Sequence, residues 1–395
     1  MDTFTRLLAP LDLEEFRSQD WQRRPRLRHA PARDAHDALF RIEHLDDVLQ
    51  SVAPNASDVD FFKAGSAVPQ AELAGPGNRL LVNRLLGHFA EGGTIHVSNL
   101  QKYVPAVRDL CKDLQLEFYA DVEADLWVTR ENRFEPYLHF DRYDIFTLQV
   151  HGKKRWRLYA PLPIEEGRAS AALDWEDVGE PLLDFEIAPG DLLYMPAYTP
   201  HVVTTVDPIS VHVGLGVHPI SYRELLEGAL TSLAERHNVL QASVPTRLIA
   251  HRAKNEAELR AALLDKAREA LEQVDIARLK DRVFDRFVEN VTHEGDRHVT
   301  RQIFELAPID STTKVRVRDR TPARAFLEPH DGRACISFAG GGFVAAPATI
   351  LPVFEFVASR REPFAIDDLP GSLDRESRIV LVRRLVDAGL CTTEP

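Results

Sequence analysis

The chain has 395 residues, of which 44% are hydrophobic, and this length and composition predict two or three domains with substantial cores. Its formal net charge of −13 is opposite to the balance that a duplex nucleic-acid-binding protein normally carries, so the sequence does not favour direct nucleic-acid binding. An acidic chain suits a basic protein or peptide as its partner, although many soluble proteins are acidic without having such a partner.

Cysteine usage and hydropathy indicate a cytoplasmic protein. The three cysteines, Cys111, Cys335 and Cys391, are widely separated and odd in number, which argues against a disulfide framework and against a cysteine metal site. The N-terminal stretch "MDTFTRLLAPLDLEEF" is acidic and mixed, and the sequence contains no run of about eighteen apolar residues. We therefore expect no membrane span and a reducing compartment.

Residues 1–115 have a mixed helical pattern that is broken by glycine and proline. The stretch "LDLEEFRSQDWQRRPRLRHA" predicts a short helix that leads into an extended basic segment. Helical periodicity returns in "RIEHLDDVLQSV" and in "GHFAEGGTIHVSNLQKYVPAVRDLCKDL". We expect this region to be a helical elaboration of the domain that follows it.

From about residue 116 to residue 219, short β-rich runs alternate with turn signals. These runs are "LEFYADVEADLWVT", "IFTLQV", "KRWRLYAP", "LLDFEIAPGDLLYMP", "HVVTTV" and "SVHVGLGV". Regularly spaced short strands joined by turns such as Pro189-Gly190-Asp191 indicate an antiparallel sandwich or barrel. The protein is therefore expected to be of the α+β class.

Residues 220–300 change to a helical pattern. The stretch "NEAELRAALLDKAREALEQV" predicts an amphipathic helix, and "ARLKDRVFDRFVENV" predicts a second one. The apolar face of the first helix is expected to pack on the β core or on a second subunit, and it carries Leu259, Ala262, Leu263, Leu271 and Val274.

Residues 301–395 form a third predicted unit. It begins with the basic strand-like stretch "TTKVRVRDRTPARAF" and ends with the pattern helix, short turn, helix, short strand, which is typical of a winged helix. Arginines in the last helix alternate with acidic residues, so this helix lacks the basic stripe of a DNA-binding element. The predicted domains are thus residues 1–219, 220–300 and 301–395.

Three residues of the β region have the pattern of a metal centre. His139 and Asp141 would lie on one face of a strand, and His201 opens a strand that the far side of a jelly-roll barrel would supply. Two histidines and one carboxylate form the facial ligand set of non-haem Fe(II) oxygenases, which leaves positions open for a co-substrate and dioxygen. The His139-x-Asp141 pair taken alone is more often structural, and a structural zinc site would require a closed set of four ligands.

Lys154 is placed where the strand pattern points into the barrel. In "KKRWRLY", Lys154 shares a face with Trp156 and Leu158, while the remaining basic residues share the other face. A buried lysine requires a partner, and the distal carboxylate of 2-oxoglutarate would supply one, with the Thr129 hydroxyl as a second donor. The alternatives are a lysine that extends its ammonium to the barrel rim and an ordinary strand threonine.

These motifs resemble a known family. "HFD", "DIFTLQVHGKKRWRLYAP" and "PGDLLYMPAYTPH" are similar to those of the JmjC/cupin-type Fe(II)- and 2-oxoglutarate-dependent oxygenases, and most similar to the ribosomal oxygenase branch, which includes the bacterial ribosomal-protein arginine hydroxylase. The resemblance covers most of the chain and implies a double-stranded β-helix (jelly-roll/cupin) JmjC core, a helical dimerisation block and a C-terminal winged-helix module. It also implies a homodimer that uses Fe(II), 2-oxoglutarate and dioxygen.

The resemblance assigns a role to each matching position. His139, Asp141 and His201 would be the iron ligands, and Lys154 would bind 2-oxoglutarate. Thr129 falls near the hydroxyl partner of this lysine, with a one-residue shift in the alignment.

The sequence departs from the family in the loop before the first histidine. Close ribosomal oxygenases carry a glycine-rich loop there, whereas this chain has the charged and bulky "RENRFEPYL". Because that loop borders the substrate entrance, the identity of the substrate and of the modified residue stays open.

Other polar and aromatic residues near the motifs are weaker candidates. The residues that flank the metal pair and would shape a peptide groove, or serve only in packing, are Trp127, Tyr137, Arg142 and Tyr143. His212 is expected to be a hydrogen-bonded core residue more often than a ligand. The spacing of His96, His151 and His218 assigns them no role.

The predicted function is hydroxylation of a side chain in a protein or peptide, with a ribosomal protein as the first candidate. The alternatives are hydroxylation of a peptide natural-product precursor or of another protein, and a catalytically silent cupin-like module that binds partners. Demethylation of N-methyl-lysine is less favoured, because it would require a narrow pocket for the methylated head group.

Overall fold

The computed structural model describes residues 3–53, 55–63, 66–130, 137–161, 173–236, 241–249, 255–290, 309–310, 312–328 and 331–393. The chain divides into two compact units, Met1–Pro219 and Ile220–Pro395. No helix in the described residues is long and apolar enough to cross a bilayer.

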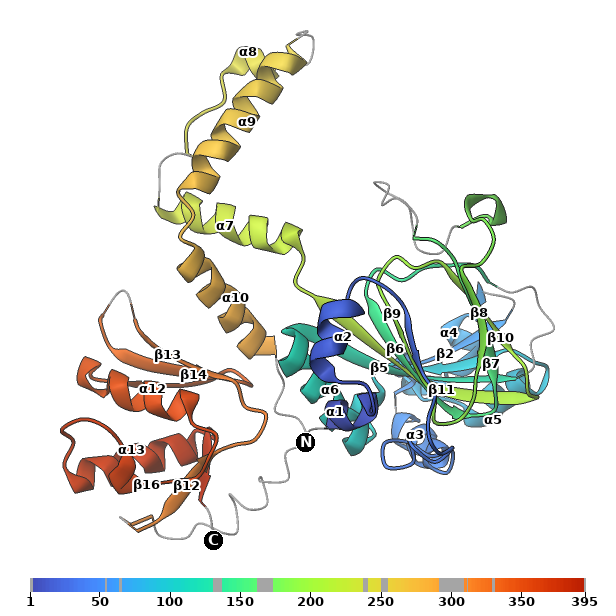
Figure 1. The fold of residues 1–395 in the computed structure, drawn as a ribbon, viewed down its shortest axis with the longest axis horizontal. Coiled ribbons are helices and arrows are strands. Elements are labelled where there is room, and N and C mark those ends of the chain that lie inside the picture. Colours follow the sequence, from blue (N-terminus) through green and yellow to red (C-terminus); the bar gives the residue numbers. More distant parts are fainter. Residues whose placement is uncertain are drawn as a thin grey trace. The chain divides into compact units, whose positions relative to one another are not determined.

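The first unit is built on two antiparallel sheets (Figure 1). In spatial order, the strands of the larger sheet are β1 (Arg26–Arg28), β9 (Leu192–Met195), β6 (Asp144–His151), β11 (Ile209–Pro219), β5 (Ala120–Arg130), β4 (Thr94–Val97), β2 (Val59–Lys63) and β3 (Ser66–Ala67). The smaller sheet consists of β10 (His201–Thr205), β7 (Lys154–Leu158) and β8 (Leu183–Ile187). The predicted antiparallel jelly-roll core is confirmed.

Strict alternation in β5 explains how the larger sheet separates core from cavity. Ala124, Leu126 and Val128 are buried in the main hydrophobic cluster. The residues between them, Asp125 and Trp127, point to the opposite face, because successive side chains in a strand alternate. One strand therefore supplies both the apolar core and the polar wall of a cavity.

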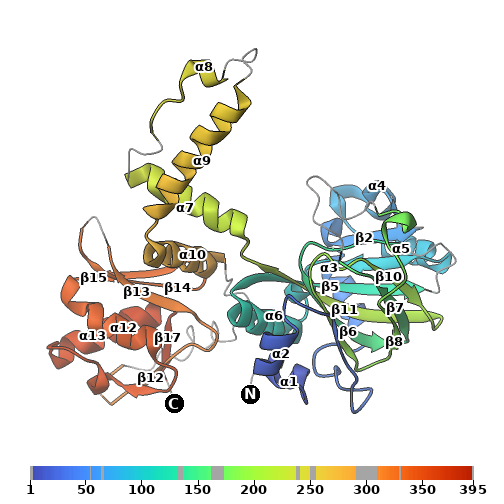
Figure 2. The same cartoon turned by 45° about the horizontal axis from the view of Figure 1, so that its top comes forward.

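Helices cover the apolar face of the larger sheet. They are α1 (Thr3–Leu8), α2 (Leu13–Gln19), α3 (His44–Val52), α4 (Gln70–Leu73), α5 (Val82–Ala90) and α6 (Pro105–Phe118). In both ribbon views α1, α2 and α6 lie together beside this sheet (Figures 1 and 2).

The predicted start of the β region at residue 116 is wrong. Residues 116–118 form the last turn of α6, and Tyr119 ends the helix in the left-handed conformation with a φ of 48°. The apolar face of α6, which includes Leu110 and Leu114, is buried in the main cluster, and this packing outweighs the strand-like local composition.

The second unit begins with helices and ends in a mixed αβ module (Figure 2). The helices are α7 (Tyr222–Arg236), α8 (Thr246–Ile249), α9 (Glu256–Glu272) and α10 (Ile276–Asn290). The strands that follow are β12 (Lys314–Val317), β13 (Ala323–Leu327), β14 (Ala334–Phe338) and β15 (Gly342–Ala346). The chain then forms α12 (Leu351–Ser359), β16 (Phe364–Ala365), α13 (Arg375–Asp387) and β17 (Cys391–Thr393).

The strands of this module pair in two sheets of three strands each. Strands β16, β12 and β17 form one sheet, and β13, β14 and β15 form another. The expected order of helix, turn, helix and terminal strand is present. Its assignment as a winged helix stays a prediction, as does the division of the second unit at residue 300.

Candidate metal centre and its cavity

An isolated backbone bridge brings the predicted metal ligands together. His139 lies in an extended segment before β6 and pairs with His201 at the start of β10. The His201 N–H donates to the His139 carbonyl at 2.8 Å, and the Tyr198 N–H donates to the Asp141 carbonyl at 2.6 Å. The expectation that His139 and Asp141 belong to a regular strand is wrong, because the pairing around them is limited to this bridge.

The side chains of these residues converge on one point. The nearest ligand atoms of His139, Asp141 and His201 all lie within 4.8 Å of one another, and His201 Nε2 is 3.6 Å from Asp141 Oδ2. The two imidazole rings have centroids 4.2 Å apart. This spacing allows one cation to contact all three residues from a single side.

Hydrogen bonds orient both imidazoles for metal binding. His201 Nδ1 is 2.9 Å from the Thr199 carbonyl, and His139 Nδ1 is 3.3 Å from the Tyr137 carbonyl. A carbonyl oxygen only accepts, so each Nδ1 carries the proton and each Nε2 presents a lone pair. This donor set fits a divalent transition metal such as Fe(II).

Burial adjusts the protonation of the centre. It lowers the pKa of His201 well below its ordinary value, with a further contribution from His139, so this imidazole is neutral as metal binding requires. Burial also raises the pKa of Asp141, while the nearby His139 and, to a smaller extent, the Tyr143 hydroxyl oppose the increase.

Lys154 points into the interior, as its strand pattern predicts. Lys154 is 4% exposed. Along β7 it is buried like Trp156, and Arg155 between them is exposed. The ammonium Nζ donates to Thr129 Oγ1 at 3.2 Å and to His212 Nδ1 at 2.9 Å. Among the described residues no carboxylate forms an ion pair with it, and burial lowers the pKa of Lys154 to about 7. The reading as a rim lysine is therefore wrong.

Thr129 on β5 and His212 on β11 lie diagonally across neighbouring strands near Lys154, because Thr129 pairs with Ser210 and His212 pairs with Trp127. Thr129 is buried and also accepts a hydrogen bond from the Thr94 hydroxyl at 3.3 Å. Burial and the nearby Lys154 charge lower the pKa of His212 well below its ordinary value, so its neutral ring accepts from the ammonium. The expectation that His212 is a hydrogen-bonded interior residue is confirmed.

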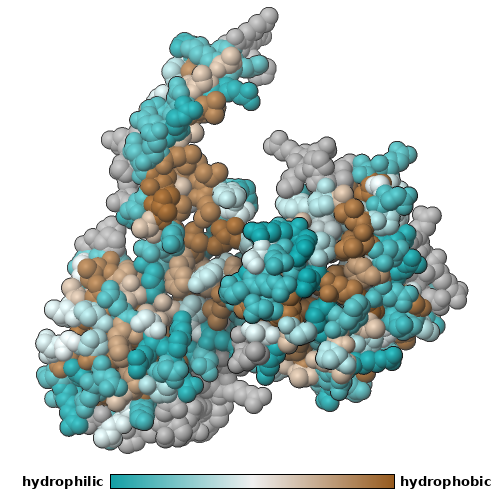
Figure 3. Space-filling model, in the orientation of Figure 1, coloured by the Kyte–Doolittle hydropathy of each residue, from teal (hydrophilic) through white to brown (hydrophobic). Residues whose placement is uncertain are grey.

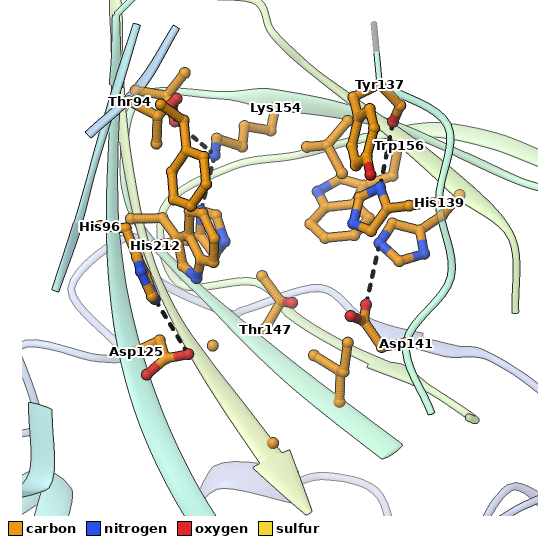
Figure 4. A pocket seen from close by; sticks show the side chains of 18 of the residues that line it. Thr94, His96, Asp125, Tyr137, His139, Asp141, Thr147, Lys154, Trp156 and His212 are labelled. Carbon is orange, nitrogen blue, oxygen red and sulfur yellow. Dashed lines mark hydrogen bonds and ion pairs between the residues drawn. The ribbon is translucent and has the colours of Figure 1, made fainter. Parts of the chain in front are cut away.

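The metal centre and Lys154 face one another across a single cavity of about 650 Å³. Figure 4 shows Lys154 on one side of this cavity and His139 and Asp141 on the other. Register explains the separation, since Leu158 pairs with His201 and Lys154 pairs with Thr205, four residues or roughly 13 Å farther along the strands. An elongated dicarboxylate therefore fits between the cation and the ammonium.

Of the weaker candidates, Trp127, Tyr137 and Tyr143 line the cavity. Arg142 is exposed and is not among the lining residues. Of the charged loop before His139, which is residues 130–138, the central residues 131–136 lie outside the described part of the chain.

Two ionisable residues of the cavity lining were given no role by the sequence. His96 on β4 and Asp125 on β5 form an ion pair of 3.3 Å between Nε2 and Oδ2, and Asp60 on β2 approaches the other ring nitrogen at 3.5 Å. The alternation of Asp125, Trp127 and Thr129 along β5 was the available signal for a polar inner face.

Comparison with known proteins was consistent with this geometry. Residues 97–225 match the family model of the JmjC domain. A protein of Drosophila persimilis, named bifunctional lysine-specific demethylase and histidyl-hydroxylase NO66, is 30% identical over 230 residues, which are 57% of this chain and 33% of that protein. The chain thus spans about a third of the length of this curated relative.

Solved structures share the fold over nearly the whole chain. The X-ray structure of E. coli ycfD has a TM-score of 0.54 at 20% identity and covers 97% of this chain and 98% of its own. A structure of YcfD, a ribosomal oxygenase from Escherichia coli, in complex with cobalt and 2-oxoglutarate, has a TM-score of 0.50 at 18% identity, with coverage of 98% and 99%. These similarities establish the fold.

Proposed function

We propose that this chain, whose residues 97–225 match the JmjC domain, is an Fe(II)- and 2-oxoglutarate-dependent dioxygenase that hydroxylates a side chain of a protein or peptide. The observation that carries the proposal is the pairing, in one cavity, of the His139, Asp141 and His201 cluster with the buried ammonium of Lys154. A three-ligand cluster leaves metal positions open, and a buried ammonium selects an anionic co-substrate.

Each residue has a defined part in this reaction. His139, Asp141 and His201 would hold the iron, and Lys154 with Thr129 would hold the distal carboxylate of 2-oxoglutarate. Iron, 2-oxoglutarate and dioxygen together supply the oxidising chemistry that inserts oxygen into a C–H bond. The protein orients the reactants and excludes water, and this arrangement needs no strong side-chain acid or base.

The substrate proposed first is a ribosomal protein. The solved relatives are described as a ribosomal oxygenase, and the curated relatives as a histidyl-hydroxylase and lysine demethylase. Ribosomal proteins are basic, and the net charge of −13 favours their approach.

We further propose that the helical region makes a homodimer in the cytoplasm. Three apolar side chains of α7, Tyr222, Leu226 and Leu230, are 85%, 46% and 39% exposed, and Figure 3 shows apolar surface gathered over this helix. The described cysteines, Cys111, Cys335 and Cys391, are all free and buried, which suits a reducing compartment.

The function is tested by incubating the protein with Fe(II), 2-oxoglutarate and a purified mixture of ribosomal proteins. Mass spectrometry should find one protein whose mass increases by one oxygen atom, with none in the Asp141→Ala variant. Loss of one methyl group instead would indicate demethylation. Binding of a partner without any mass change, in protein that retains iron, would support the silent binding module and contradict the proposal.

A further inference from the structure

The cavity wall across from the metal centre carries a charge cluster that the proposed chemistry does not use. His96 lines the cavity beside Trp127, with ring centroids 4.1 Å apart and an angle of 28° between the planes. Figure 4 shows His96 and Asp125 on the side of the cavity opposite His139 and Asp141. This wall therefore faces the space that a target side chain must enter.

Strand register fixes His96 between two carboxylates. On one side it pairs with Asp60 of β2, and on the other with Trp127 of β5, two residues from Asp125. Its Nδ1 contacts Asp60 Oδ2 at 3.5 Å and its Nε2 contacts Asp125 Oδ2 at 3.3 Å. Neither nitrogen makes a hydrogen bond within the described residues, so these contacts are ion pairs, and the ring places positive charge beside both carboxylates only when it carries both protons.

The surrounding charges support this protonated form. Burial alone would lower the pKa of His96, but the carboxylates of Asp125 and Asp60 outweigh it and raise the pKa to about 9. The ionisable groups that face His96 from the neighbouring strands are Asp60 on β2, Glu123 and Asp125 on β5, and His212 on β11. His96 is therefore a cation at neutral pH.

The His96 cation makes the net charge of the cavity zero. Among the lining residues, Asp125 and Asp141 are the carboxylates, and His96 and Lys154 are the matching cations. Fe(II) and the dianion of 2-oxoglutarate would add equal and opposite charges. Asp60, the third carboxylate, is half-exposed and lies outside the lining, where solvent screens it. A loaded cavity of this composition has no net charge left to stabilise a buried guanidinium or ammonium.

We propose that His96 is a specificity-determining residue: its imidazolium neutralises Asp125, so the cavity accepts an uncharged target side chain in preference to a cationic one. Asp125 is held in place for this pairing, because its Oδ1 also accepts from the Asn99 N–H at 3.2 Å. The inference rests on the proposed function, since it assumes that the target side chain enters beside the bound iron and 2-oxoglutarate. A neutral imidazole or carboxamide fits this requirement, whereas arginine and methylated lysine do not.

The test uses two probes of the same shape that differ in charge, N-acetyl-citrulline amide and N-acetyl-arginine amide. The full chain is loaded with Zn(II), as a diamagnetic substitute for iron, and with 2-oxoglutarate. Each probe is titrated at pH 7.5 while the indole N–H signals are followed by NMR. The chain has four tryptophans; Trp127 and Trp156 line the cavity, whereas Trp21 and Trp175 do not and serve as internal controls.

In the wild type, citrulline amide should shift the Trp127 signal with a dissociation constant at least about tenfold below that of arginine amide. His96→Gln should remove this difference or reverse it, because Asp125 is then an uncompensated anion. His96→Arg, which keeps the charge, should retain the wild-type order. His88→Gln, a change of a histidine outside the cavity lining, should have no effect.

Two results would overturn the inference: a wild-type protein that binds arginine amide as tightly as citrulline amide, or a ratio that His96→Gln leaves unchanged. Failure of the proposed function is distinguishable, because the Trp156 ring lies 5.6 Å from the His201 ring and its signal reports loading. A Trp156 signal that does not respond to Zn(II) and 2-oxoglutarate would count against the metal site itself.

Discussion

Lys154 is the residue whose ionisation should depend most on what the cavity holds. Its pKa is lowered to about 7 by burial, so above this pH the free protein carries largely neutral lysine. A bound carboxylate favours the charged form and raises the pKa, so binding of 2-oxoglutarate takes up a proton. The affinity is then highest below pH 7 and decreases as the pH rises above 7.

We expect calorimetry at pH 8, in two buffers of different ionisation enthalpy, to show uptake of close to one proton as 2-oxoglutarate binds. Lys154→Arg should bind without this uptake, because a guanidinium stays protonated. Binding by the wild type with no net proton exchange at pH 8 would contradict the role given to Lys154.

Tyr143 acts on the metal centre through Asp141. Its hydroxyl lies beside the Asp141 carboxylate, where it stabilises the charged form of this ligand and opposes the rise in the pKa of Asp141. Tyr143→Phe should weaken Co(II) binding by about 10- to 100-fold, the usual effect of losing a partner of a metal ligand. Calorimetric titration checks this, with the exposed Tyr222→Phe as control. Equal affinities in both variants would show that Asp141 is held by other groups.

At the scale of elements, the turn between β6 and β7 determines where Lys154 lies. Gly152 has a φ of +61°, and a Cβ there would overlap the Ile209 carbonyl oxygen. The side-chain amide of Gln149 donates to the Gly152 carbonyl at 2.8 Å and holds the turn. Both observations make glycine the residue that this turn requires.

Gly152→Ala should lower the free energy of unfolding by about 1–3 kcal/mol or more, because the backbone would be strained and the new Cβ would overlap the Ile209 carbonyl oxygen. Gly87→Ala, in the middle of α5 with open space around it, should instead raise it by about 0.5–1 kcal/mol. Denaturation followed by tryptophan fluorescence is suitable, because all four tryptophans lie in the first unit. A neutral effect of Gly152→Ala would mean that the turn relaxes freely.

What the sequence could predict at this scale depended on how local the signal was. The alternation in β7 was sufficient to predict that Lys154 is buried. The contact of His96 with Asp60 was not predictable, because it depends on the pairing of β2 with β4, which neither strand shows by itself. The end of α6 was missed because tertiary burial of Leu110 and Leu114 decides it.

At the scale of the whole molecule, the change to a helical pattern predicted a boundary after residue 219, where the chain divides into its two compact units, but it did not predict the assembly. The helices of residues 220–290 follow the predicted pattern, yet Leu263 and Leu271 on the predicted apolar face of α9 are 59% and 45% exposed. Exposed apolar side chains that gather in one patch mark an interaction surface. The periodicity of the sequence does not identify the surface that covers these side chains.

If α7 forms the dimer interface, negative charges placed on its apolar face should separate the subunits. Leu226→Glu combined with Leu230→Glu should convert a dimer into a monomer, because like charges would meet in an apolar contact. Sedimentation velocity measures this, and Leu182→Glu, at an exposed site of the first unit, is the control. A wild type that sediments as a monomer at micromolar concentration would contradict the dimer.

The most direct test of the central claim is an anaerobic absorbance titration with Fe(II) followed by 2-oxoglutarate. We expect a weak visible band from iron and the keto acid in the wild type. The band should be absent in His139→Ala and should require more 2-oxoglutarate in Lys154→Ala. A folded, iron-loaded wild-type protein that shows no band would contradict the oxygenase function and leave a binding module as the better account.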